Sequence, residues 1–146
     1  MKRNVLITGA ASGIGRETAV RFMEQGDRVT GCDIDRNGLE SLARQAEEKL
    51  WSFGMQILDL VSLNTLEHLY KEIEKEGKLD VLVNCAGICS GTRLDEMTPL
   101  EWDRTYAVNL RGPFFLTQRL IPLLKESEAP VIINVSSMAG FTGGIQ

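Results

Sequence analysis

The chain has 146 residues, of which 43% are hydrophobic and 25% charged, a composition typical of one soluble globular domain. Its net charge of −4 excludes the basic surface expected of a nucleic-acid-binding protein. The apolar run after Lys2 and Arg3 ends at Thr8, too early for a signal peptide, and no apolar window is long enough to span a membrane. We therefore expect a cytoplasmic protein with no membrane or nucleic-acid partner.

Three cysteines, Cys32, Cys85 and Cys89, lie in or beside apolar strand-like runs. An odd number in such positions favours buried, reduced thiols over disulfides, as in a cytosolic protein. No further cysteine or histidine accompanies Cys85 and Cys89 as a metal ligand, and the only histidine, His68, stands in a charged helical stretch. We expect no metal site.

Short apolar runs alternate with segments of helical periodicity along the chain. Strands that are apolar on both faces and separated by helices predict a parallel sheet covered on both sides. Right-handed crossovers then give one domain with a doubly wound, Rossmann-type α/β fold, which binds ligands outside the carboxyl ends of its strands. In chain order we expect strand Asn4–Ile7, helix Gly13–Gln25, strand Arg28–Asp33, loop Ile34–Asn37, helix Gly38–Lys49, strand Met55–Leu58, helix Ser62–Glu76, strand Leu79–Asn84, a mostly helical Thr98–Lys125 and strand Val131–Val135.

A glycine-rich loop, Thr8-Gly9-Ala10-Ala11-Ser12-Gly13-Ile14-Gly15, joins the first strand to the first helix. Glycines here let the backbone approach a phosphate closely, and the N–H groups at a helix start point outward. A P-loop is excluded, because Gly15 is followed by Arg16 where that motif requires lysine. Glycines between a strand and a helix also form plain tight turns, so the loop alone leaves both interpretations open.

Asp33 ends the second strand, where a dinucleotide-binding fold places an acid that accepts hydrogen bonds from the adenosine ribose. A carboxylate there repels a 2′-phosphate, and neither Ser12 nor Ile34 supplies a positive charge. NAD is therefore favoured over NADP. Arg36 keeps NADP open, because a nearby arginine can tolerate a phosphate, and Asp33 can also serve only as a loop cap.

Taken in order, these motifs resemble the short-chain dehydrogenase/reductase family. The resemblance covers nearly the whole chain and implies an NAD(P)-dependent oxidoreductase that transfers a hydride between nicotinamide and an alcohol or ketone. It rests on the glycine loop, Asp33, the adenine contact Asp59-Leu60, Asn84-Cys85-Ala86-Gly87 in place of Asn-Asn-Ala-Gly, Val108-Asn109-Leu110-Arg111-Gly112 around the active-site asparagine, and Ile133-Asn134-Val135-Ser136-Ser137 before the catalytic serine.

The resemblance also implies roles for single residues. Ser137 matches the serine that holds the substrate oxygen, with Ser136 as the competing assignment, and Asn109 matches the asparagine of a proton relay. Asn84 is expected chiefly to tie neighbouring strands together, and Ala86 and Gly87 to be small because the cofactor ribose presses against them. The implied cofactor contacts are Gly9, Ser12, Gly13, Ile14, Gly15, Asp33, Asp59, Leu60, Asn84, Ala86 and Gly87.

Pro113 lies four positions after Asn109 in the same expected helix. Proline has no N–H to donate, so the Asn109 carbonyl is expected to be free to hold the water of the family's relay. A simple helix kink is the alternative.

The family's Tyr-x-x-x-Lys pair is absent. Family spacing from Ser137 places that tyrosine just past Gln146, and neither Tyr70 nor Tyr106 has a lysine four residues later. We expect the 146 residues to bind cofactor but to turn over inefficiently, without general acid–base help. With the sixth strand missing, Val131–Val135 becomes a sheet edge, and we expect it to recruit a second copy or to belong to a longer enzyme.

Two other functions stay open. One is a non-catalytic module that binds or senses a nucleotide. The other is a methyltransferase, whose sheet also begins with a glycine loop and carries an acid after the second strand, but which leaves Asn84, Asn109 and Ser137 unexplained.

Overall fold

The computed structural model, which describes residues 2–139, contains one parallel sheet with the strand order β3-β2-β1-β4-β5. The order reverses at β1, so β2 and β3 extend to one side and β4 and β5 to the other. This reversal is the topological switch point at which doubly wound sheets bind ligands. The fold predicted from the sequence is confirmed, with strands β1 Asn4–Thr8, β2 Arg28–Asp33, β3 Phe53–Ile57, β4 Val81–Asn84 and β5 Val131–Asn134.

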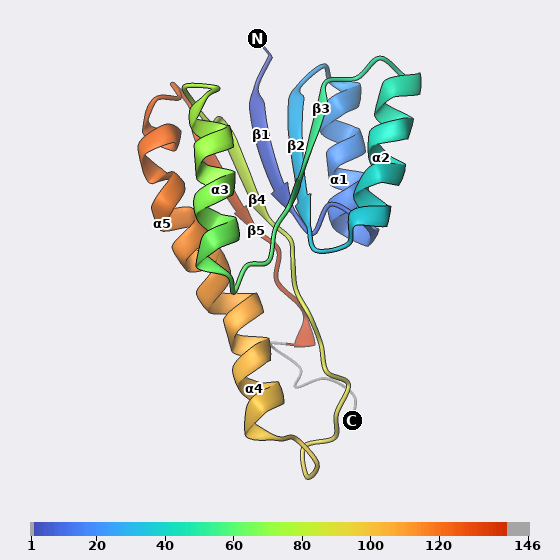
Figure 1. Ribbon diagram of the computed structural model, residues 1–146, viewed down its shortest axis with the longest axis vertical. Helices are drawn as coiled ribbons and strands as arrows, with labels where there is room; N and C mark the ends of the chain where they lie inside the picture. Colours follow the sequence, from blue (N-terminus) through green and yellow to red (C-terminus); the bar gives the residue numbers. More distant parts are fainter. Residues whose placement is uncertain (1, 140–146) are drawn as a thin grey trace.

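Helices cover both faces of the sheet, with α1 and α2 on one face and α3 and α5 on the other (Figure 1). The α4 helix runs into α5 through a π-helical turn, η1, on the side away from α1 and α2 (Figure 1). The helices are α1 Gly13–Glu24, α2 Arg36–Glu48, α3 Leu63–Glu74, α4 Pro99–Tyr106, η1 Ala107–Arg111 and α5 Gly112–Lys125.

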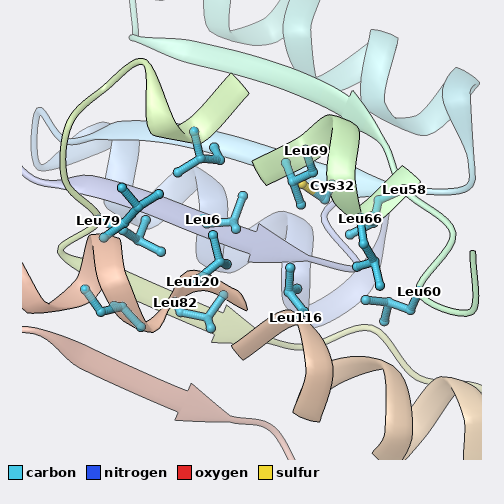
Figure 2. Packing of buried hydrophobic residues seen from close by; sticks show 13 residues of the cluster. Leu6, Cys32, Leu58, Leu60, Leu66, Leu69, Leu79, Leu82, Leu116 and Leu120 are labelled. Atoms are coloured by element: carbon cyan, nitrogen blue, oxygen red, sulfur yellow. The ribbon is translucent and has the colours of Figure 1, made fainter. Parts of the chain in front are cut away.

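Alternate residues of each central strand enter different cores, as the two-residue period of a strand requires. In β1, Leu6 belongs to the cluster under α3 and α5, together with Leu69 and Leu120 (Figure 2). Its neighbours Val5 and Ile7 belong to the other cluster, with residues of α1 and α2. All five side chains are 2% exposed or less. Both faces of the sheet are thus covered at its central strands, and its carboxyl edge is left for ligands.

Element boundaries differ from the sequence prediction by up to two residues, most at the starts of α2, β3 and β4 and at the end of α3. The α2 helix begins at Arg36 rather than Gly38, because the Asp35 side chain accepts a hydrogen bond from the Gly38 N–H at 3.2 Å and caps the helix. The β3 strand begins at Phe53 rather than Met55, where it pairs with β2. The start of β3 depends on pairing with another strand, which local patterning does not encode, whereas the Asp35 cap is a local signal that hydrophobic periodicity does not register.

The β5 strand is the edge of the sheet formed by the described residues, as predicted. Val131, Ile132 and Ile133 are 40–45% exposed, although their sequence is that of an interior strand. Recruitment of a second copy by this edge stays a prediction. No helix within residues 2–139 combines the length and the apolar character needed to cross a bilayer.

Candidate functional site

A cleft of about 450 Å³ opens at the carboxyl edge of the sheet, a size within the usual range of ligand pockets. Gly13 and Asp33, on which the dinucleotide interpretation depends, both line it. Ten of the predicted cofactor contacts are among its lining residues: Gly9, Ser12, Gly13, Ile14, Gly15, Asp33, Asp59, Leu60, Ala86 and Gly87.

The glycines of the loop differ in what they do. Gly13 has φ +52°, and no described atom lies within 4 Å of where its Cβ would stand, so its backbone faces open space at the cleft. A Cβ on Gly15 would lie 2.1 Å from the Gly9 carbonyl oxygen. A Cβ on Gly9 would lie 2.9 Å from Ala86 Cα. Only Gly13 therefore fits the predicted reason, close approach to a phosphate, and the other two are required for packing within the protein.

The amino end of α1 forms one wall of the cleft. Its N-cap Ser12 has extended backbone, its hydroxyl makes no capping bond, and the first turn of α1 contains no acidic residue. The first N–H groups of a helix lack intrahelical acceptors and lie at the positive end of the helix dipole. This wall therefore suits an anion such as a pyrophosphate.

Two backbone groups hold the Asp33 carboxylate in place. Oδ2 accepts a hydrogen bond from the Ala11 N–H at 3.0 Å, and Oδ1 accepts one from the Asp35 N–H, also at 3.0 Å. Ala11 belongs to the glycine loop, so the first bond joins the two halves of the motif directly. Each carboxylate oxygen keeps capacity for a further donor such as a ribose hydroxyl.

The far end of the cleft is formed after β3. Asp59 Oδ1 accepts the Val61 N–H at 3.0 Å, and Leu60 is buried against α5, where a Cβ on Gly112 would lie 2.7 Å from Leu60 Cβ.

Sequence reasoning did not single out several residues that line the cleft. For Val108 a signal was present, since it precedes Asn109 within the same motif. The other lining residues not assigned a cofactor contact are Thr8, Cys32, Ile34, Leu58, Val61, Cys85, Ile88, Arg104 and Val135.

Asn84 ties β4 to its neighbours, as predicted. Its side chain is 5% exposed, and its Nδ2 donates to Asn134 Oδ1 of β5 at 2.9 Å and to Thr117 Oγ1 of α5 at 3.1 Å. Thr8 Oγ1 in β1 accepts the N–H groups of Cys85 and Ala86, both at 3.1 Å. Asn84 is not among the residues that line the cleft, so its contact with a cofactor stays a prediction.

Asn109 pairs with the backbone of Ile88. Its Nδ2 donates to the Ile88 carbonyl at 2.8 Å, and its Oδ1 accepts the Ile88 N–H, also at 2.8 Å. This two-point contact fixes the segment that follows β4, where Ala86 and Gly87 line the cleft. Sequence reasoning missed it, because nothing local relates Asn109 to Ile88.

The helix around Asn109 is wider than an α-helix. Within η1, the Gly112 N–H donates to the Ala107 carbonyl five residues earlier. In that register the Asn109 carbonyl is opposite the N–H of Phe114 rather than Pro113. The argument that Pro113 leaves this carbonyl without a donor therefore applies only to an α-helical register. The free carbonyl stays a prediction, and a π-turn at this place is itself typical of functional sites.

Ser136 and Ser137 follow β5 and are both exposed. The Ser137 hydroxyl accepts the Ala139 N–H at 3.1 Å, and Val135, two residues earlier, lines the cleft. The pair thus lies at the same carboxyl edge of the sheet as the other motifs. The catalytic role of Ser137, and the choice between it and Ser136, stay predictions.

The prediction of three buried cysteines is wrong for Cys89, which is exposed, and only partly right for Cys85, which is half-buried. The reason is that β4 ends at Asn84 and the chain then leaves the sheet in a long loop (Figure 1). Cys32, inside β2, is fully buried, and burial raises its pKa. All three thiols are free, and among residues 2–139 no group of three or more His, Cys, Asp or Glu side chains is placed to hold a metal.

A family model described as short chain dehydrogenase matches residues 3–146. The chain belongs to the short-chain dehydrogenase family. The match overturns the methyltransferase alternative. Over 139 residues this short-chain dehydrogenase is 37% identical to a 3-oxoacyl-[acyl-carrier-protein] reductase of Thermotoga maritima, covering 94% of this chain and 56% of the relative. Over 135 residues it is 31% identical to a D-threitol dehydrogenase of Mycolicibacterium smegmatis, covering 92% and 52%.

Two solved structures of similar sequence have a similar fold. An actinorhodin polyketide ketoreductase with NADPH superposes with a TM-score of 0.91 at 31% identity, covering 99% of this chain and 56% of that one. A metagenomic short-chain oxidoreductase in complex with NADP gives 0.86 at 31% identity, covering 94% and 63%. The chain spans about half the length of the curated relatives it matches.

Proposed function

We propose that this short-chain dehydrogenase is an oxidoreductase that binds a nicotinamide dinucleotide in the cleft and moves a hydride between it and an alcohol or ketone. The observation that carries the proposal is that the open backbone at Gly13, the uncompensated start of α1 and the fixed Asp33 carboxylate share one cleft. A pyrophosphate suits the open backbone at Gly13 and the start of α1, and an adenosine ribose suits the Asp33 carboxylate. When bound, the nicotinamide supplies the hydride chemistry.

We further propose NAD as the preferred dinucleotide. A 2′-phosphate beside the ribose would meet the Asp33 carboxylate. The two arginines near Asp33 already have partners within the protein. Arg36 Nη1 lies 3.9 Å from Glu40 Oε1, and the Arg16 guanidinium donates to three acceptors on α2. The cation among the cleft's described lining residues is Arg104, which comes from α4 on the side away from α2 (Figure 1). Because two solved relatives were crystallised with NADPH and with NADP, the proposed preference for NAD distinguishes this protein from them and can be tested.

Calorimetric titration with NAD and with NADP tests both proposals. We expect NAD to bind more tightly than NADP, and Asp33→Ala to weaken NAD binding about tenfold or more, because a charge-assisted hydrogen bond is lost. The matched control is Asp95→Ala, which removes an exposed carboxylate that pairs with Arg93. Tighter binding of NADP would overturn the NAD preference, and binding of neither would overturn the function.

The substrate class follows from the family and from Ser137. We propose a small alcohol or ketone whose oxygen is held by the Ser137 hydroxyl. Neither Tyr70 nor Tyr106 has a lysine four residues later, so we propose that these 146 residues bind the cofactor without supplying the family's proton-transfer pair. Turnover is measured from the absorbance of NADH with a panel of alcohols and ketones. No turnover by any longer form of the protein would contradict the substrate class.

We also propose that the protein works in the cytoplasm and associates with a second copy. The three free thiols are compatible with a reducing compartment. The exposed apolar edge of β5 supports association, because an unpaired interior-type strand recruits a partner strand.

A further inference from the structure

A path of hydrogen bonds leads from the glycine loop through Asp33 to the start of α2. The Ala11 N–H and the Asp35 N–H each donate to the Asp33 carboxylate at 3.0 Å. The Asp35 carboxylate in turn accepts the Gly38 N–H at 3.2 Å. The orientation of Asp33 is therefore coupled to where the first turn of α2 lies.

Arg16 closes this path into a ring. Its Nη1 donates to the Gly38 carbonyl at 3.1 Å, and its Nη2 donates to Gln45 Oε1 at 3.0 Å and to Ser41 Oγ at 3.4 Å. Since Arg16 directly follows Gly15, the guanidinium ties the first turn of α1 to α2. We call the closed path the α1–α2 ring and define it as Ala11, Asp33, Asp35, Gly38 and Arg16.

Gly38 of α2 packs closely against Ala11 of the glycine loop. A Cβ on Gly38 would lie 2.7 Å from Ala11 Cβ and 2.9 Å from the Ala11 carbonyl oxygen. The backbone of α2 thus lies directly on the glycine loop. The hydrogen bonds of Arg16 help to hold α2 in this contact, so we expect their loss to let the start of α2 shift relative to Ala11.

We propose that Arg16 is a positioning residue for the adenosine half of the cofactor, holding α2 against the glycine loop so that the Asp33 carboxylate keeps its direction into the cleft. The inference rests on the proposed function, because Asp33 matters only where a dinucleotide binds. Arg16 itself is not among the residues that line the cleft. Its effect on binding would therefore be indirect, and the proposal requires that this effect pass through Asp33 rather than through the start of α1.

The test is a double-mutant cycle measured by calorimetric titration with NAD. Arg16→Met keeps the aliphatic stem and removes the guanidinium, and we expect it to weaken NAD binding about tenfold. In an Asp33→Ala background we expect the same substitution to change the affinity less than about twofold, because the residue it positions is gone. Arg16→Lys should recover part of the loss, since an ammonium can reach one of the acceptors.

The matched control is Arg21→Met on the same helix, where the guanidinium pairs with Glu17 and should leave NAD affinity unchanged. NAD affinity of Arg16→Met within about twofold of wild type would overturn the proposal, as would an equal loss with and without Asp33. If Arg16→Met does not fold, Gln45→Met removes one acceptor from α2, and the same cycle applies with a loss of about threefold expected. Failure of the wild-type protein to bind either dinucleotide would instead overturn the proposed function.

Discussion

At the scale of single residues, identical amino acids in one motif are required for different physical reasons. Gly13 leaves open space at the cleft, whereas Gly9 is a packing position that lets the loop lie against the backbone at Ala86. Gly9 also has φ +74°, a left-handed conformation that side chains disfavour. Substitution at Gly9 should therefore affect stability, because it disturbs the joint between the glycine loop and β4.

We predict that Gly9→Ala destabilises the protein by about 2–4 kcal/mol, the sum of backbone strain and a steric clash. The matched control is Gly77→Ala, which has nearly the same φ, +75°, but no described atom within 4 Å of the added Cβ. Gly77→Ala should lower the free energy of unfolding by about 1 kcal/mol. Urea unfolding of both variants gives the two values, and equal losses would show that packing against Ala86 contributes nothing.

At the scale of elements, the helix starts differ in whether a side chain caps them and in whether they lie at the cleft. Asp35 caps α2, and Thr98 caps α4 in a reciprocal capping box with Glu101. Ser12 at the start of α1 makes no capping bond with its side chain, and α1 is the helix whose first turn lines the cleft. The start of α3 at Ser62 is also uncapped, but Ser62 is not among the residues that line the cleft, so α1 is the helix that presents an uncapped start there.

The capping box predicts a measurable stability effect. Thr98→Ala removes the bond from the Glu101 N–H to Thr98 Oγ1 and should lower the free energy of unfolding by about 1 kcal/mol. Ser62→Ala at the start of α3 is the control, because the Ser62 side chain makes no capping bond. Its urea midpoint should stay close to that of the wild type. A loss at Ser62 as large as that at Thr98 would contradict the assignment.

At the scale of the whole molecule, the two edges of the sheet carry different chemistry. The carboxyl edge holds the cleft, whereas the amino edge is tied by buried carboxylates. Asp80 accepts hydrogen bonds from the Asn4 N–H, Lys78 Nζ and Ser127 Oγ. Asp27 pairs with Arg3. The candidate cleft and these buried carboxylates thus lie at opposite ends of the strands.

The amino edge predicts acid sensitivity. Burial alone would raise the pKa of Asp80, but the bonds from Ser127, Asn4 and Lys78 outweigh it and lower the pKa below its ordinary value. A carboxyl group with a lowered folded-state pKa stabilises the protein above its unfolded pKa, and this contribution is lost as the pH falls through the folded value. We therefore expect stability to fall below about pH 4.

The Asp80→Asn variant tests this origin. It should be about 1–3 kcal/mol less stable than the wild type at neutral pH, because a buried charge-assisted network is weakened. Its stability should also fall less steeply below about pH 4. Asp103→Asn, an exposed change on α4, controls for the loss of one negative charge. Urea unfolding at several pH values gives the free energy of unfolding of each variant as a function of pH. Parallel curves for wild type and Asp80→Asn would contradict the prediction.

The exposed β5 edge predicts association in solution. Ile132→Lys places a charge on the edge strand and should shift the protein towards the monomer in sedimentation experiments, because charged residues oppose strand pairing. Leu63→Lys is the control, since Leu63 is 75% exposed and lies on α3 rather than on the edge strand. A wild-type protein that is monomeric at all concentrations would contradict association through this edge.

Much of the fold and part of the site could be predicted from the sequence by itself. Hydrophobic periodicity is local, so it predicted the alternation of strands and helices, and Asp33 and the glycine loop could be placed together because parallel strands end at one edge. Periodicity could not predict the Asp35 cap that starts α2 at Arg36. Nor could it predict that Cys89 lies exposed in the loop after β4.

The tertiary structure alone decided which distant groups meet. The pairing of Asn109 with Ile88, and the reach of Arg16 to Gly38 and Gln45, join segments that no repeat or spacing relates. Such contacts depend on how closely helices pack on the sheet and on one another, which is set by the whole set of buried side chains. The sequence by itself therefore determined the layout of the cleft, and only packing determined how its residues are held.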